Sequence, residues 1–218
     1  RSPSARAWSS WSAAASSASS RPSSAMALAR LAARPPVNCE GSLSTRLPRP
    51  VPATASVVIG VDPPAGENGA CGIVVCGLLS DGRGVVLADC SVAGLRPEGW
   101  ATRVAAAFAA WSADRVIAET NNGGSMVESV LRTAAPGLPI RLVHASYGKS
   151  ARAEPVAAAF ETGRCLFAGD FGELEDELTA LTPGGYSGGR SPDRADAMVW
   201  ALTELVVNMP PEPRMRGL

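Results

Sequence analysis

The chain has 218 residues, enough for one domain of ordinary size or for a domain with an extension. Its 20 basic and 20 acidic residues cancel, but they are unevenly distributed. Residues 1–50 contain seven arginines and one acid, Glu40, so the rest of the chain is acidic. An acidic domain cannot bind nucleic acid through its overall charge, and any such binding has to come from a local basic patch.

Composition also argues against a zinc protein of the Cys/His type, a secreted protein and a membrane protein. The five cysteines form no C-x-x-C pair and the chain has one histidine, His144, so a zinc site of the Cys/His type is not expected. An odd number of cysteines without a secretory signal fits a reducing cytoplasm. No apolar run approaches the roughly 20 residues that a membrane span needs. We therefore expect a cytoplasmic protein with no membrane partner.

Residues 1–50 contain 13 serines and 11 alanines and show no sustained helix or strand period, so we expect them to be disordered. Their Arg- and Ser-rich, acid-poor composition resembles that of an organellar transit peptide. The alternatives, which we favour, are a simple tail or an upstream segment translated outside its natural reading frame. One domain is expected at 51–210, followed by a short tail at 211–218.

A change of pattern at residue 56 marks the first strand of this domain. Ser56–Asp62 is mostly β-branched, ends in an acid and is followed by Pro63-Pro64, which predicts a buried strand. Two more strands are expected at 71–79 and 85–92, joined by a glycine-rich turn. The three strands are close enough in sequence to form an antiparallel meander.

After the meander, helices and strands alternate. The expected elements are a helix at 97–111, a strand at 114–119, a helix capped by Ser125 and reaching about Ala135, a strand at 140–144, a helix at 154–161, a short strand at 165–168, a helix at 171–181 and a last helix at 191–207. Ser191 is the expected N-cap of the last helix, with Pro192 at its first position. This order predicts an α/β domain with a mixed sheet of five to six strands and helices on both faces, and it matches the ribonuclease H-like fold.

Carboxylates end two of the predicted strands and recur in the last helix. Asp62 ends the first strand and Glu119 the fourth, while Asp193 and Asp196 are three residues apart and share a helix face. Strand ends converge on one crevice of an open α/β sheet, where ligands bind. Acids gathered there repel one another unless cations neutralise them, and their oxygen ligands select Mg²⁺ or Mn²⁺. Two such ions would support phosphodiester hydrolysis.

Three of these acids also have a simpler explanation. Asp62 could cap the turn that follows it, and Glu119 could form a surface ion pair with a nearby arginine. Asp193 suits the first turn of a helix because of the helix dipole. Asp196 lies deeper in an apolar helix and has no such explanation, so the four acids argue for a metal site more strongly together than separately.

Four stretches carry a more specific pattern: VVIGVDPPAG (57–66) with CGIVVCG (71–77), RVIAETNNGG (115–124), GKSARAEPVAAAFETGRC (148–165) and GELEDELTALTPGGYSGGRSPDRADAMVWALTEL (172–205). Together they resemble the nuclease domain of phage large terminase subunits, in the branch found in phage-like gene transfer agents. The resemblance runs from about residue 56 to residue 207.

The resemblance implies roles for the acids. Asp62, Glu119 and Asp196 would be the catalytic, metal-binding acids of a two-metal mechanism, with Asp62 bridging the ions. Asp193 would be an adjacent ligand or a group that contacts the ligands without binding metal itself. It implies two Mg²⁺ or Mn²⁺ ions and cleavage of concatemeric double-stranded DNA during packaging into a capsid. The implied protein partners are the portal protein and the small terminase subunit, in the cytoplasm of a bacterial host.

The packaging motor of a terminase is an ATPase, and no GxxxxGK[ST] loop occurs in this sequence. Gly148-Lys149-Ser150 imitates the end of that motif, but Val143 stands where its first glycine would be. We therefore expect a nuclease portion without its motor.

The alternatives to a nuclease of this family are a non-catalytic prophage relic or capsid- or portal-binding module, an actin-like-fold ATPase and, by fold analogy alone, a Holliday-junction resolvase. An actin-like-fold ATPase needs a turn that binds phosphate after its first acid, and Pro63-Pro64 does not supply one.

Basic residues near the predicted site are candidates for contacts with DNA phosphates. Lys149, Arg152, Arg190 and Arg194 lie in loops or first helical turns that flank the acids. The alternative is that Lys149 and Arg152 are solvated charges at a helix start, and that Arg194 pairs with an acid one turn away.

Three tryptophans lie at apolar positions of predicted helices. Trp100, Trp111 and Trp200 are therefore predicted to be core residues.

Overall fold

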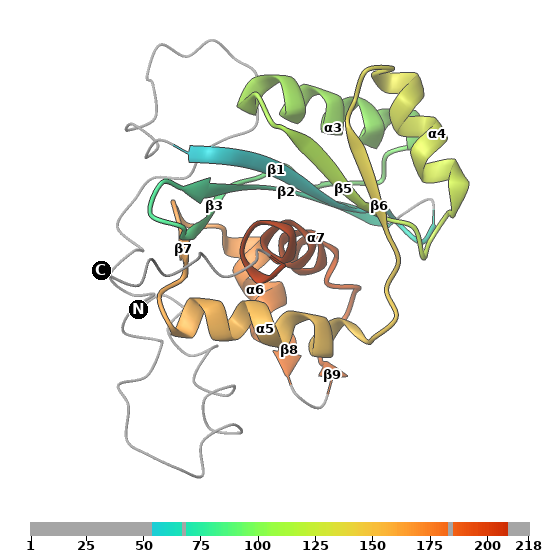
Figure 1. Cartoon of the computed structure of the whole chain (residues 1–218). Helices are drawn as coiled ribbons and strands as arrows, with labels where there is room; N and C mark the ends of the chain where they lie inside the picture. Colours follow the sequence, from blue (N-terminus) through green and yellow to red (C-terminus); the bar gives the residue numbers. More distant parts are fainter. Residues whose placement is uncertain (1–53, 67–68, 183–184, 209–218) are drawn as a thin grey trace.

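A computed structural model describes residues 54–66, 69–182 and 185–208 of the chain. The disordered segment expected at 1–50 and the tail expected at 211–218 lie outside the described residues. The described residues form a mixed β-sheet with helices on both faces, which confirms the predicted class of fold (Figure 1).

The main sheet contains seven strands within the described residues. They are β1 (Thr54–Asp62), β2 (Ala70–Leu79), β3 (Gly84–Asp89), β4 (Val92–Ala93), β5 (Arg115–Glu119), β6 (Ile140–Val143) and β7 (Cys165–Phe167). Their order is β6-β5-β1-β2-β3-β7, with β4 paired to β2. Strand β2 is antiparallel to β1 and β3, as the predicted meander requires, whereas β1, β5 and β6 run parallel.

Helices cover the two faces of this sheet in separate groups. They are α3 (Pro97–Trp111), α4 (Ser125–Ala134), α5 (Lys149–Glu161), α6 (Gly172–Ala180) and α7 (Asp193–Leu202). Helices α3 and α4 lie on one face, and α5, α6 and α7 lie on the other (Figure 1). Among the described helices, none is both long enough and apolar enough to cross a membrane.

Alternation along β1 decides which side chains face which group of helices. Val57, Ile59 and Val61 belong to the core beneath α3 and α4, whereas Val58 belongs to the core beneath α5, α6 and α7. Successive side chains of a strand point to opposite faces. Asp62 is four residues after Val58, so its carboxylate is directed to the face that α7 covers.

Helix α7 packs directly on β1 and β2 because two glycines leave room for its backbone. A Cβ added at Gly60 would lie 1.9 Å from the carbonyl oxygen of Ala197, and one at Gly72 would lie 1.9 Å from that of Asp193. Gly72 is also the partner of Asp62 in the β1–β2 ladder. The first turn of α7 is thereby held against the end of β1.

Two predicted elements differ from the structure by more than two residues at one end. The strand expected at 85–92 divides into β3 and the short β4. The helix expected at 154–161 begins five residues earlier, at Lys149, and contains Pro155. Proline lacks the N–H that would bond to the carbonyl of Ala151, but Ala151 and Pro155 are both exposed, so water can satisfy that carbonyl.

The predicted helix caps are also wrong in detail. The N-cap of α4 is Gly124, with a φ of 53°, and Ser125 is the first helical residue. Pro192 occupies the N-cap position of α7, and no side chain caps that end. The last predicted helix continues beyond α7 as a π-helical segment, Thr203–Val207.

One pair of short strands beyond the end of α6 is absent from the sequence prediction. The short strands β8 (Leu181–Thr182) and β9 (Gly185–Tyr186) pair antiparallel beyond the end of α6.

Candidate metal centre

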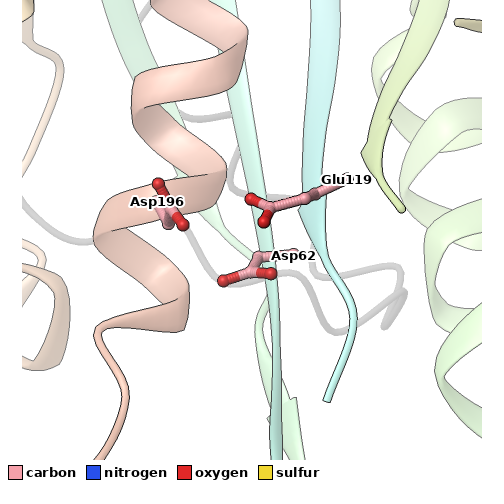
Figure 2. Close-up of side chains that lie close together, drawn as sticks. All are labelled: Asp62, Glu119 and Asp196. Carbon is pink, nitrogen blue, oxygen red and sulfur yellow. The ribbon is translucent and has the colours of Figure 1, made fainter. Parts of the chain in front are cut away.

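Three buried carboxylates meet where neighbouring strands of the sheet end. Asp62 ends β1, Glu119 ends β5 and Asp196 lies in the first turn of α7 (Figure 2). One carboxylate oxygen from each lies within 4.8 Å of the other two. Their exposed fractions are 1% for Asp62, 4% for Glu119 and 2% for Asp196. Ionisable groups are rarely buried to this extent without a partner or a ligand.

The fold brings these acids together through strand register and helix packing. Strands β1 and β5 are parallel neighbours, with Val61 opposite Ala118, so that the next residues, Asp62 and Glu119, lie at the same edge. Helix α7 lies across that edge because of the glycine contacts described above. Asp196 therefore approaches both strand ends from the helix layer.

Lys149, the first residue of α5, lies among three of the acids. Its Nζ is 2.8 Å from Asp62 Oδ2, 3.1 Å from Asp196 Oδ2 and 3.5 Å from Asp193 Oδ1. The same ammonium group donates a hydrogen bond of 3.0 Å to Ser191 Oγ. Ser191, predicted as a helix cap, thus serves as an acceptor for Lys149.

Arg152 and Trp200 also contact the acids. The Arg152 guanidinium donates to Glu119 Oε2 at 3.0 Å and to Asp196 Oδ2 at 2.7 Å. Trp200 Nε1 donates to the same Glu119 oxygen at 2.7 Å. The Arg152 guanidinium carbon also lies 4.8 Å from the centre of the Trp200 ring, in a cation–π contact.

Burial changes the protonation of the acids. Burial raises the pKa of Asp62 to about 8, against the opposing attraction of Lys149. Burial likewise raises the pKa of Asp196 to about 6, against the charges of Lys149 and Arg152. The pKa of Lys149 is lowered by burial but raised more strongly by Asp62 and Asp196, so this ammonium stays charged. The cluster thus holds acids that are costly to ionise unless more positive charge is supplied.

The donor set of the cluster fits a hard divalent cation. All of its ligand atoms are carboxylate oxygens, which Mg²⁺ and Mn²⁺ prefer. With Asp62, Glu119, Asp193 and Asp196 ionised and two cationic side chains present, the formal charge of the cluster is −2. Asp196 Oδ1 is buried and has no hydrogen-bond partner among the described residues. An orphaned buried carboxylate oxygen of this kind is suited to ligating a metal.

The remaining predicted site residues lie around this cluster. Asp193 is 8% exposed and lies at the edge of the cluster, with its Oδ1 facing the Lys149 ammonium. Arg190 is exposed in the loop that precedes α7. Arg194 points away from the cluster, where its guanidinium pairs with Asp89, Glu173 and Glu177.

The alternative explanation of Glu119 as half of a surface ion pair does not fit the structure. Arg115 and Arg141, the arginines nearest to it in the strands, both pair with Glu204. Glu119 is instead buried, and its hydrogen bonds come from Arg152 and Trp200.

Trp200 is the site residue that the sequence prediction misses, because its apolar helical position favours a core role. A signal is nevertheless present: Asp193, Asp196 and Trp200 are spaced i, i+3 and i+7, and so share one face of α7. Trp100, by contrast, is 1% exposed and is a core residue as predicted.

An antiparallel meander followed by parallel strands, with acids from β1, β5 and the last helix at one edge, is the ribonuclease H-like architecture. The family model described as the terminase RNase H-like domain matches residues 59–205. The chain belongs to this family, which confirms the resemblance seen in its sequence. Family membership and the buried acidic cluster support a metal-dependent nuclease.

Solved structures with the same fold come from thermophilic phages. The large terminase nuclease of phage G20c with bound magnesium is 19% identical, covers 68% of this chain and 81% of its own, and has a TM-score of 0.56. The same nuclease with bound cobalt is 18% identical over equal coverage, with a TM-score of 0.57. The large terminase of a second thermophilic bacteriophage is 16% identical, with 73% of this chain and 41% of that one covered and a TM-score of 0.54.

At identities below 20%, these structural similarities show a common fold. The chain spans less than half of the second phage's large terminase. No curated protein matches this sequence.

Proposed function

We propose that this chain is a metal-dependent endonuclease that cuts double-stranded DNA during the packaging of phage or gene-transfer-agent DNA. The observation that carries the proposal is the cluster of three buried carboxylates within 4.8 Å, all from different elements of the fold. A cluster of buried acids is costly to the fold, and a bound cation offsets that cost. Membership of the terminase RNase H-like family supports the packaging context.

Asp62, Glu119 and Asp196 would hold two Mg²⁺ or Mn²⁺ ions, with Asp62 as the shared ligand and Asp193 beside them. When bound, the ions supply activation of a water molecule and stabilisation of the leaving oxygen in phosphodiester hydrolysis. The magnesium and cobalt bound by the G20c nuclease support a divalent ion for this chain as well.

Lys149 is the basic residue best suited to meet the substrate. Its side chain is 27% exposed, and its ammonium already spans Asp62 and Asp196. Once those acids ligate metal, the ammonium is free to take a DNA phosphate as its partner. Arg190, exposed in the loop before α7, would contact the DNA backbone farther from the scissile bond.

The other two arginines have less freedom to bind DNA. The Arg152 side chain is 9% exposed and is already bonded to Glu119 and Asp196, so a phosphate contact would be confined to its edge. Arg194 would have to leave three carboxylates to reach a phosphate. Both residues are proposed to make DNA contacts secondary to that of Lys149.

The portal protein and the small terminase subunit are the proposed protein partners, and the bacterial host cytoplasm is the proposed location. Both proposals follow from the terminase family and from its role in packaging. Pull-down of purified portal protein and small subunit by this chain would test the partners, and failure to capture either would contradict them.

Cleavage of supercoiled plasmid by the full chain tests the enzymatic proposal. We expect nicking or linearisation with Mg²⁺ or Mn²⁺, none with EDTA, and loss of at least a hundredfold in rate in Asp62→Asn, Glu119→Gln and Asp196→Asn. Asp81→Asn is the matched control, because Asp81 is an exposed acid in a surface turn, paired with Arg83. Its rate should equal that of the unmodified protein.

The outcomes separate the possible functions. Cleavage retained in Asp62→Asn or Asp196→Asn would remove the catalytic assignment. A folded protein that binds metal without cutting would point to dependence on a packaging motor. A folded protein that neither binds metal nor cuts would favour the non-catalytic relic.

A further inference from the structure

Glu119 has a longer side chain than the aspartates of the cluster. More rotatable bonds must therefore be held in place to orient its carboxylate. Two donors converge on one of its oxygens, Oε2: the Trp200 indole at 2.7 Å and the Arg152 guanidinium at 3.0 Å. The Glu119 side chain is 5% exposed, so these hydrogen bonds form away from bulk water. In such surroundings they hold a carboxylate more firmly than they would at the surface.

The location of Trp200 on α7 brings its indole N–H to Glu119. It lies one turn after Asp196 on the same helix face, since residues four apart are neighbours on a helix. Helix α7 thus provides one acid of the cluster and, one turn later, a donor to an acid from β5. Asp196 and the indole donor to Glu119 are therefore carried by the same helix.

The indole donor differs from the two cationic side chains of the site in its charge. Lys149 and Arg152 both bring positive charge to the acids, which competes with a metal cation. An indole N–H is neutral and can only donate, so it orients Glu119 without opposing a cation at the other ligand atoms. Arg152, stacked on the Trp200 ring at 4.8 Å, in turn holds the indole in place.

We infer that Trp200 is a positioning residue of the metal site, which orients the Glu119 carboxylate for metal binding through its indole N–H. This inference rests on the proposed metal-dependent nuclease function and adds to it a residue from outside the acidic cluster. Groups that hydrogen-bond a metal ligand and fix its orientation typically change metal affinity by about 10- to 100-fold when they are removed.

Trp200→Phe is the test variant, because it keeps an aromatic ring beneath Arg152 and removes the N–H. In titration calorimetry with Mn²⁺ on the full chain, we expect the dissociation constant to rise by about tenfold or more. Trp111→Phe is the matched control: Trp111 is half-buried in α3, on the opposite face of the sheet, and should leave the dissociation constant unchanged.

A spectroscopic measurement on the unmodified protein keeps the inference testable if Trp200→Phe folds poorly. In ¹H–¹⁵N spectra, the indole N–H resonance of Trp200 should shift on addition of Mg²⁺ and should also shift in Glu119→Gln. The indole resonance of Trp111 should not move in either case. The shift in Glu119→Gln reports the hydrogen bond itself, and the shift on addition of Mg²⁺ reports its coupling to metal binding.

The results distinguish failure of this inference from failure of the proposed function. Equal Mn²⁺ affinity in Trp200→Phe and the unmodified protein, or a Trp200 resonance that ignores Mg²⁺, would overturn the positioning role alone. An unmodified protein that does not bind Mn²⁺ would overturn both.

Discussion

Lys149 is held by more acceptors than its position at the start of a helix requires. Its ammonium contacts Asp62, Asp193, Asp196 and the Ser191 hydroxyl. In the metal-free protein this charge offsets part of the repulsion between the acids. In the proposed function the same ammonium contacts a DNA phosphate once the acids hold metal, so Lys149 would have a different partner in each state of the site.

These two roles predict effects of opposite sign in Lys149→Gln. We expect Mn²⁺ to bind the free protein several-fold more tightly, because a competing cation is gone. Binding of a short DNA duplex in Ca²⁺ should weaken, and the slope of log affinity against log salt should fall by about one, as for the loss of one phosphate contact. Filter binding across a salt series measures the slope.

Lys149→Arg is the control for charge and should keep the salt slope of the unmodified protein. If Lys149→Gln tightens Mn²⁺ binding but leaves the salt slope unchanged, Lys149 acts only as a counter-ion to the acids. The proposed contact with DNA would then be wrong.

Among the individual site residues, the sequence predicts those that stand out from their immediate neighbours in the chain. Asp62 and Glu119 stand out because each follows an apolar strand, and Asp196 because an acid is out of place in an apolar helix. Trp200 escapes notice because a tryptophan at an apolar helix position needs no further explanation. Its hydrogen bond to Glu119 depends on how α7 crosses β5, which no local pattern encodes.

Among the helices and strands, α7 decides the geometry of the site. It approaches β1 and β2 as closely as it does because Gly60 and Gly72 have no side chains. Asp193 and Asp196 therefore reach the strand ends from its first turn. A larger residue at either glycine would separate the helix from the strands that carry Asp62.

Gly72→Ala should accordingly damage both the fold and the site. The added Cβ would lie 1.9 Å from the carbonyl oxygen of Asp193, so the start of α7 must shift. We expect the free energy of unfolding to fall by about 1–3 kcal/mol, as for other overpacked positions, and Mn²⁺ affinity to fall with it. Urea denaturation and titration calorimetry measure the two effects.

Gly137→Ala is the control, because a Cβ there meets nothing within 4 Å. Gly72→Ala with unchanged stability and unchanged Mn²⁺ affinity would contradict the close approach of α7 to β2.

The elements themselves are predictable to different degrees. The strands of the meander and α3 follow from apolar runs and turn residues that are local in sequence. The sequence places the start of α5 too late, because Pro155 is normally a barrier within a helix and its exposed setting is not visible in a local pattern. The crossing of α7 over Gly60 and Gly72 depends on residues more than 100 positions away and cannot be read from local patterns.

For the whole molecule, the acidic cluster joins the first strand, the fifth strand and the last helix. These segments are far apart in sequence, so repulsion or attraction within the cluster acts on the entire fold. Binding of an ion to the folded form alone stabilises it by about 2.7 kcal/mol at a hundredfold excess over the dissociation constant. Metal binding and pH should therefore change global stability together.

In the metal-free protein, stability should fall as the pH rises from 6 to 9. Burial raises the pKa of Asp62 to about 8 and that of Asp196 to about 6. Between the ordinary value of 3.8 and these raised values, the folded form binds more protons than the unfolded chain. The stabilisation is complete below the unfolded-state pKa and is lost as the pH passes through the folded-state pKa. Glu177, whose pKa burial raises to about 7, adds a contribution of the same sign.

Mg²⁺ should reverse this dependence, because carboxylates ligate metal only when deprotonated and binding releases their protons. Thermal unfolding in EDTA and in excess Mg²⁺, at several pH values between 6 and 9, measures both effects: the midpoint in EDTA should decline with pH, while the increase caused by Mg²⁺ should grow. Asp62→Asn should flatten the decline and abolish most of the increase, whereas Asp81→Asn should do neither.

A midpoint in EDTA that rises over this range, or a Mg²⁺ effect equal at pH 6 and pH 9, would show that Asp62 is ionised before the metal arrives. In that case Lys149, and not a proton, neutralises the site in the metal-free protein.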